Sequence, residues 1–270
     1  LPVLILIIFF FIPFAWFYLL PNSLSDFSSS IFFSTFFTSN FFFNNVGHDY
    51  GDALSITKPF LHTWSLSVEE QFYILYPLFF FCCFKFIKNK LLILLISISV
   101  LSLALAQYGS INFSISNFYL LPTRIWEIFC GAILVVMNSN KNNNKFSKDI
   151  FSYIGLTLVL LSFYFFTDDT LHPSFKTVIP VFGTMLVIRF SNNNFVSSFL
   201  SHKFLVFIGL ISYSLYLWHY PIFSFSEILG FDSSNISKSI FILISLFLSS
   251  VMYVFAGHVL HLILAILLAS

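Results

Sequence analysis

Long apolar runs, each able to cross a lipid bilayer, occupy most of this chain. Of the 270 residues, 58% are hydrophobic and 41 are Phe. A bilayer-spanning helix needs roughly 17 to 25 mainly apolar residues, and its backbone polar groups must be satisfied within the helix. We therefore expect an all-α, polytopic transmembrane helical bundle of about eight spans. The expected spans are residues 1–20, 71–88, 91–107, 118–137, 151–167, 176–190, 204–226 and 239–264.

A ninth apolar segment, residues 27–43, carries Ser, Thr and Asn between its Phe residues. We expect it to lie in the interface or to re-enter the membrane. Lys and Arg collect in cytoplasmic loops, and here they gather at residues 85–90, 141–148 and 189–203. That distribution places the segment 44–70 on the outer side.

The run from Leu61 to Tyr73, LHTWSLSVEEQFY, concentrates polar groups at the mouth of an apolar helix. Only 9% of the chain is charged, and ionisable groups at membrane depth are costly and usually line cavities or pathways. The run therefore predicts a functional site. Its candidate residues are His62, Trp64, Ser65, Glu69, Glu70, Gln71 and Tyr73.

Two interpretations of the helix start in this run stay open. Ser67 followed three residues later by Glu70 is the pattern of a capping box, which predicts a helix from Val68 to about Lys88. Glu70 would then be explained as a cap. An earlier start would instead put Ser65, Glu69, Tyr73 and Tyr76 at helical spacing, as a polar stripe.

Arg124 and Glu127, within PTRIWEIFCG, stand at i and i+3 and can pair on one helix face. A structural ion pair explains them as well as a binding site does. Pro122 suits the first turn of that helix.

A second polar stripe is expected in GLISYSLYLWHYP, where Ser212, Tyr216 and His219 fall at i, i+4 and i+7. Pro221 removes a backbone donor beside His219 and favours a kink. These residues are either part of a polar cavity or interfacial anchors.

The formal net charge of +1 offers no basic face for nucleic acid. The three Cys have no ligand spacing, and His258 and His261 lack partners that would complete a metal site, so we predict no metal and no bound cofactor. Residues 1–255 form one expected membrane domain. Residues 256–270 turn Ala- and Leu-rich and form an atypical tail.

Several of these motifs resemble the acyltransferase-3 family of integral membrane O-acyltransferases over about residues 1–255. The most specific match is HTWSLSVEEQFYILYP at 62–77, preceded by the Ser39-Asn40 step. LPTRIWEIFCGAIL at 121–134 and IGLISYSLYLWHYPI at 208–222 follow in the same order, with IPVFGTMLV at 179–187 as weaker support.

The resemblance implies a multi-pass enzyme of the bacterial inner (cytoplasmic) membrane. Such enzymes take an acyl group, commonly acetyl from acetyl-CoA as co-substrate, and deliver it to a hydroxyl of an extracytoplasmic glycan. Acceptors in the family include lipopolysaccharide, peptidoglycan, exopolysaccharide and macrolide-type molecules. The expected partners are the lipid bilayer, a glycan acceptor and acyl-CoA.

The family's catalytic His follows an Arg by eleven positions on a first helix, and that pair is missing here. The two Arg are Arg124 and Arg189, and eleven positions on stand Val135 and Leu200. Leu1-Pro2 resembles the start of the family's third helix, and a closing Glu-x-Pro-x-Arg signature is also missing. We therefore expect residues 1–270 alone to be a fragment that enters a membrane but does not acylate.

By the same resemblance, the catalytic candidates are Glu69, Glu70 and His62, and we expect Glu69 or Glu70 to orient a partner His or bind sugar hydroxyls. His62, Trp64 and Tyr73 would shape the acceptor mouth, with Trp64 stacking on a sugar face. The further substrate-binding candidates are Ser65, Gln71, Arg124, Glu127, Tyr216 and His219.

Two other functions remain open. A transporter or flippase for a glycan or a lipid-linked precursor would use the same polar stripes as a pathway, although no internal repeat is visible. A non-catalytic scaffold is the third interpretation.

Overall fold

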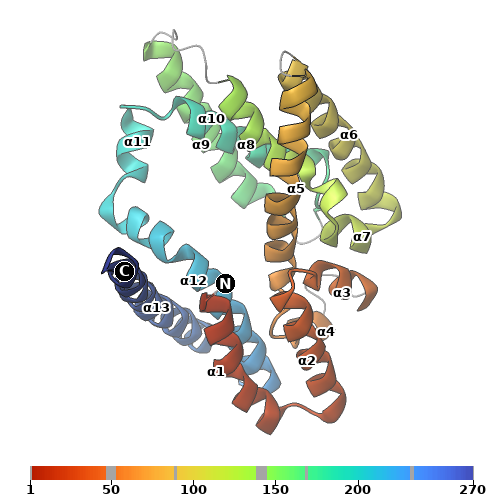
Figure 1. The fold of residues 1–270 in the computed structure, drawn as a ribbon, viewed down its shortest axis with the longest axis vertical. Coiled ribbons are helices and arrows are strands. Elements are labelled where there is room, and N and C mark those ends of the chain that lie inside the picture. The colour runs from red at the N-terminus through yellow and green to blue at the C-terminus, as the bar shows by residue number, and fades with distance from the viewer. Residues whose placement is uncertain are drawn as a thin grey trace. The chain divides into compact units, whose positions relative to one another are not determined.

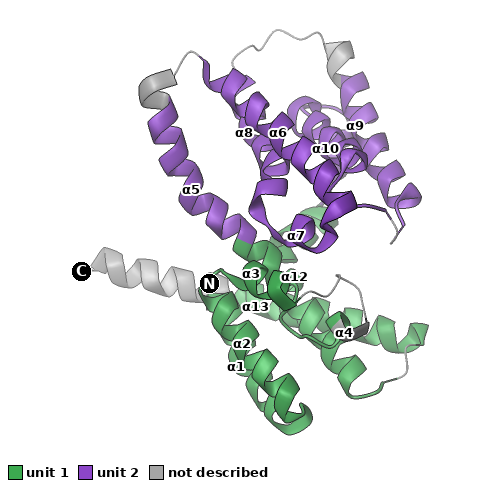
Figure 2. Ribbon diagram, turned by 90° about the vertical axis from the view of Figure 1, so that its right-hand side faces the viewer, with its two compact units in different colours: residues 1–67, 203–270 green, residues 68–202 purple. Residues whose placement is uncertain are grey.

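A computed structural model describes residues 2–46, 53–87, 90–137, 145–167, 170–231 and 234–269, and every regular element in those ranges is a helix (Figure 1). The all-α prediction is confirmed. The chain divides into two compact units, residues 1–67 with 203–270 and residues 68–202 (Figure 2).

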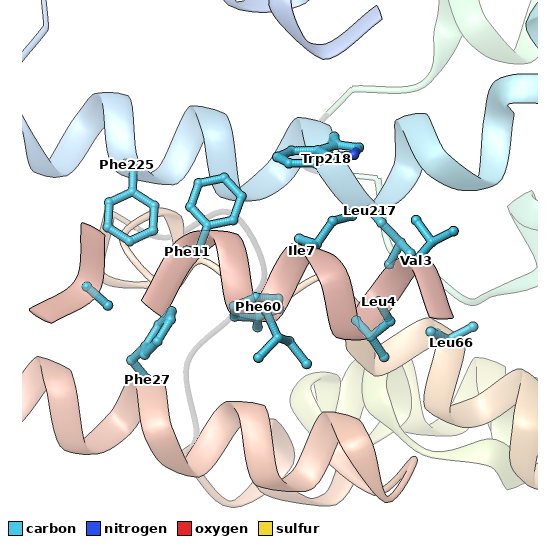
Figure 3. Close-up of a cluster of buried hydrophobic side chains, with 12 residues drawn as sticks. Val3, Leu4, Ile7, Phe11, Phe27, Phe60, Leu66, Leu217, Trp218 and Phe225 are labelled. Carbon is cyan, nitrogen blue, oxygen red and sulfur yellow. The ribbon is translucent and has the colours of Figure 1, made fainter. Parts of the chain in front are cut away.

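The first unit joins the two ends of the sequence, because α12 packs against both α13 and α1. Its core lies between α1 and α12 (Figure 3). Phe11 of α1 stacks on Phe225 of α12 with ring centroids 5.2 Å apart, and it meets Trp218 at 5.8 Å. The helices of this unit are α1 (Pro2–Tyr18), α2 (Pro21–Thr35), α3 (Ser39–Val46), α4 (Ala53–Ile56), the start of α5 (Thr63–Ile87), α12 (Lys203–Ile228) and α13 (Asn235–Ala269).

The second unit contains the remainder of α5 and a tight pair of helices, α9 and α10. Gly155 and Gly183 allow their close approach, since a Cβ on Gly155 would lie 2.7 Å from the Gly183 carbonyl oxygen. The other elements here are α6 (Leu91–Asn112), α7 (Ser114–Tyr119), η2 (Leu121–Thr123), α8 (Ile125–Met137), α9 (Lys145–Phe165), η3 (Phe175–Thr177), α10 (Val178–Phe190) and α11 (Phe195–Leu200).

Three of the described helices are long and apolar enough to cross a membrane: Leu91–Asn112, Lys203–Ile228 and Asn235–Phe255. Shorter apolar helices cover Pro2–Tyr18, Ile125–Met137 and Asp149–Phe165. These helices support a multi-pass membrane protein, while the total of eight spans stays a prediction.

Two expected segments are each broken in the structure. Residues 118–137 do not form one helix, because the short turn η2, Leu121–Thr123, contains Pro122, and α8 begins only at Ile125. Residues 27–43 divide into α2 and α3 around Phe37, whose φ of 54° ends the first helix. A positive φ is costly for a bulky residue, so it marks a true boundary.

The helix of the polar run begins at Thr63, well before Val68. The prediction of a capping box at Ser67 is therefore wrong, and the alternative with an early start is correct. Glu69 and Glu70 stand beyond the first turn of α5, so neither caps it. The atypical tail continues α13, and its side chains lie outside the described residues.

Candidate active site

His62 is a buried imidazole at the entrance to α5. The turn that carries it is closed by backbone bonds from Thr63 to Phe60 (3.1 Å) and from Trp64 to Leu61 (3.2 Å). The residue is only 1% exposed, and neither ring nitrogen makes a well-formed hydrogen bond with the described residues, although the backbone of Pro59 offers a weak one. Buried polar atoms in folded proteins are nearly always paired, so an exception needs an explanation.

Three side chains of α12 surround this ring. Tyr216, His219 and Tyr220 stand at i, i+3 and i+4 and so share one helix face. Their ring centroids lie 5.2, 5.8 and 5.1 Å from that of His62, with Tyr220 stacked and the other two edge-on. We call His62, Tyr216, His219 and Tyr220 the His62 cluster.

Tyr216 ties the entrance of α5 to α12. Its hydroxyl donates to the backbone carbonyl of His62. It also lies 2.6 Å from the Ser65 hydroxyl, and since its one proton is already used, Ser65 is the donor in that bond. The predicted candidates His62, Ser65 and Tyr216 are thus brought together by the fold.

In the neutral form of His219, the hydrogen bond of the ring decides which nitrogen accepts. Its Nδ1 lies 3.1 Å from the carbonyl of Leu215, and a carbonyl only accepts, so Nδ1 carries the proton of the neutral ring. Nε2 is then a lone-pair acceptor. Tyr220 donates to the carbonyl of Ser55 at 3.2 Å, which holds the segment before α5 against α12.

His62 stays uncharged at neutral pH. Burial lowers the pKa of His62 well below its usual value, and the nearby His219 lowers it further. A hydrogen bond to the backbone of Pro59 raises the pKa of His62, but by less than burial lowers it. The cluster therefore resists holding two positive charges.

Buried hydroxyls hold the rest of the entrance in place. The Ser34 and Thr63 hydroxyls lie 2.6 Å apart, and those of Ser39 and Ser67 lie 2.7 Å apart. The Ser67 hydroxyl also accepts from the Ser39 backbone amide at 3.2 Å. Ser67 thus joins α5 to α3, which is why it does not cap a helix of its own.

The remaining candidates of the polar run lie on either side of the boundary between the two units. Trp64 is 8% exposed and packed in the first unit, so its stacking role stays a prediction. Glu69 and Tyr73 are exposed, while Glu70 and Gln71 are partly buried, and all four belong to the second unit. Their roles stay predictions too.

Arg124 organises a second cluster of polar side chains, within the second unit. It pairs with Glu127 at 3.5 Å, as the spacing predicted, and its Nε donates to the Phe118 carbonyl at 3.1 Å. A nitrogen of Arg124 also donates to Nε2 of His172 at 3.1 Å. Partial burial and the charge of Arg124 lower the pKa of His172 to about 4.

Glu127 also lines a groove of about 340 Å³ between α8 and α10. Its other walls are mostly apolar, with Cys130, Gly131 and Thr184 among them. A carboxylate in the wall of an apolar groove is a specific polar contact for a ligand, so Glu127 and its partner Arg124 stay predicted substrate-binding candidates.

The sequence interpretation missed Tyr220 and His172. Tyr220 was accessible to it, since it stands four residues after Tyr216 on the same helix. His172 was not, because 48 positions separate it from Arg124 and no spacing rule joins them.

Comparisons with known proteins agree with these motifs. The acyltransferase-3 family model, described as "Acyltransferase domain", matches residues 1–269. The peptidoglycan O-acetyltransferase OatA of Listeria monocytogenes is 30% identical over 215 residues, covering 73% of this chain and 34% of that protein. The O-acetyltransferase OatA of Staphylococcus aureus is 32% identical over 192 residues, covering 66% of this chain and 31% of that protein.

No solved structure matches the chain. The aligned part spans about a third of the length of the curated relatives. Since the family model covers nearly every residue, the chain belongs to the acyltransferase-3 family.

Proposed function

We propose that the chain is the membrane part of a bacterial O-acetyltransferase that acts on a cell-envelope glycan. In this proposal, acetyl comes from acetyl-CoA at the cytoplasmic side of the inner membrane, and the acceptor is a sugar hydroxyl on the outer side. Family membership and the names of both relatives support acetyl transfer. The peptidoglycan named for the Listeria relative supports a glycan acceptor.

The observation that carries the proposal is the buried imidazole of His62 beside the lone pair of His219. A sugar hydroxyl would donate to Nε2 of His219, which is partly exposed, beside the buried ring of His62. This contact suits a neutral polyol, because the imidazole is satisfied without gaining charge.

The reaction joins the acceptor oxygen to the thioester carbonyl carbon and breaks the bond from that carbon to sulfur. The hydroxyl proton passes to a base, and the departing thiolate of CoA takes up a proton. By family resemblance, the base is a His that follows an Arg by eleven positions, a pair that residues 1–270 do not contain. His219 therefore orients the hydroxyl in this account, and orientation alone is worth a large share of a transfer rate.

Acetyl transfer itself separates this proposal from a transporter. Membranes containing the chain joined to two upstream helices of a relative would be given acetyl-CoA labelled in the acetyl group and a glycan pool. We expect label in alkali-labile esters on the glycan. Glycan that crosses the membrane without gaining acetyl would support a transporter and contradict the proposal.

The chain of 270 residues alone is the matched control. Without the family's base, transfer should fall by roughly 10²- to 10⁴-fold. Equal transfer by this shorter chain would place the base within residues 1–270 and make His219 the first candidate.

A further inference from the structure

A pocket of about 180 Å³ lies in the first unit, between α2, α3 and the segment that leads into α5. Its lining combines an acid, Asp26, and a base, Lys58, with hydroxyls of Ser23 and Thr57. Phe42 supplies an aromatic wall. A pocket of this size suits one small ring better than a long chain.

The two charged groups of this pocket are near one another without being paired. No ion pair within 4.0 Å joins Asp26 and Lys58 among the pairs of the described chain. The charge of Asp26 nevertheless raises the pKa of Lys58, which burial lowers by a larger amount. The pocket thus offers a carboxylate acceptor and an ammonium donor with little net charge between them.

This donor and acceptor set suits a neutral polyol. Hydroxyls donate to a carboxylate and accept from an ammonium group, whereas an anion such as phosphate would also face the carboxylate of Asp26. The C–H face of a pyranose packs on an aromatic ring, and Phe42 is fixed for such a contact because it stacks on Phe33 with centroids 5.0 Å apart.

The same short segment connects the pocket to the His62 cluster. Pro59 lines the pocket, and its backbone is a weak hydrogen-bond partner of the His62 ring. The backbone amide of Lys58 donates at 3.1 Å to the Ser55 carbonyl, the same carbonyl that accepts from Tyr220. The segment from Ser55 to His62 therefore contributes residues to both the pocket and the cluster.

We propose that this pocket is a subsite for one neutral pyranose ring of the acceptor glycan, next to the ring whose hydroxyl is presented at the His62 cluster. The inference rests on the function proposed above, and it adds a place where acceptor length is recognised.

Binding without an acyl donor tests the subsite. The chain in nanodiscs would be titrated by calorimetry with a β-1,4-linked N-acetylglucosamine tetrasaccharide. We expect Asp26→Asn and Lys58→Gln each to weaken binding by roughly 10- to 100-fold, because a hydrogen bond to a charged group is lost. Glu227→Gln and Lys238→Gln, which change exposed residues outside the pocket, should leave the dissociation constant unchanged.

Ser23→Ala is a second pocket variant that should leave the protein folded, because Ser23 is exposed on α2. We expect it to weaken tetrasaccharide binding several-fold, since one hydroxyl of the pocket is lost. Equal affinity of all pocket variants and wild type would overturn the inference. So would a protein that binds phospholipid headgroups and does not bind the tetrasaccharide when each is titrated separately.

Failure of the subsite and failure of the proposed function give different results. In the chain joined to the two upstream helices, His219→Gln should lower acetyl transfer by about 100-fold or more while tetrasaccharide binding persists. If that joined chain with no substitution binds the tetrasaccharide through Asp26 and transfers no acetyl group, the subsite stands and the proposed function falls. If transfer occurs and Asp26→Asn changes neither tetrasaccharide binding nor KM for long acceptors, the proposed function stands and the subsite falls.

Discussion

Replacing His62 with Leu should stabilise the protein while it removes acetyl transfer. The ring is 1% exposed, and neither nitrogen makes a well-formed hydrogen bond with the described residues. Each unsatisfied buried polar atom costs about 1–3 kcal/mol, and an apolar residue of similar volume relieves that cost. The lost stacking on Tyr220 at 5.1 Å opposes the gain by about 0.5–1.5 kcal/mol.

With two such nitrogens, the balance favours the His62→Leu protein by at least about 0.5 kcal/mol. For a chain of this size, 1 kcal/mol shifts Tm by roughly 2–4 °C. The assay is a thermal melt of both proteins in the same detergent at neutral pH, with acetyl transfer measured in parallel on both chains joined to the two upstream helices. His219→Leu is the control, because it breaks the bond to the Leu215 carbonyl and should not raise Tm.

A fall in Tm of several degrees for His62→Leu would refute this reasoning. It would mean that the imidazole makes stabilising contacts in the folded protein. The residue would then be explained by stability and not by function.

Three further predictions concern other parts of the molecule. Wild-type Tm should fall as pH drops below about 6.5, the pKa of an unfolded His. Burial lowers the pKa of folded His62, so the unfolded chain binds more protons in that range. His62→Leu should reduce this pH dependence of Tm in melts from about pH 7.5 to 5. Tyr216→Phe loses bonds to the His62 carbonyl and Ser65, and it should lower stability by about 1–3 kcal/mol in denaturant titrations. Gly155→Ala should destabilise by about 1–3 kcal/mol, because the new Cβ meets the Gly183 carbonyl at 2.7 Å.

Each of these predictions has a control or a contrary result. A flat pH profile shared by both proteins would contradict the assignment to His62. A Tyr216→Phe protein as stable as wild type would mean that solvent replaces both bonds. Gly209→Ala is the control for the α9–α10 contact, since nothing lies within 4 Å of its new Cβ and Ala favours a helix by about 1 kcal/mol.

Helix type was predictable from the sequence, and helix ends were not. The apolar runs that became α6, α12 and α13 carry their own signal, because a bilayer-length run admits few other structures. The start of α5 was harder, since Ser67 and Glu70 form a convincing local cap. Tertiary hydrogen bonds of Ser34 and Ser39 with Thr63, the first residue of α5, decided that start, and no local pattern records them.

The sequence predicted most residues of the candidate site, but it did not predict which of them lie in contact. His62 and Ser65 stood out because polar residues are rare in this chain, and helical spacing identified Tyr216 and His219. Their meeting depends on a contact across more than 150 positions, which the fold supplies. The pocket around Asp26 and Lys58 gave no signal, because its walls come from separate segments.

The central claim is that the His62 cluster presents a glycan hydroxyl for acetyl transfer, and the activity of His219→Gln tests it most directly. The measurement compares label transferred from acetyl-CoA to glycan by wild type, His219→Gln and the exposed-residue control His202→Gln, each joined to the two upstream helices. The account predicts that His219→Gln loses about 100-fold or more of the transfer rate with Tm and tetrasaccharide binding kept, while the control stays active. Transfer by His219→Gln at the level of His202→Gln would contradict it.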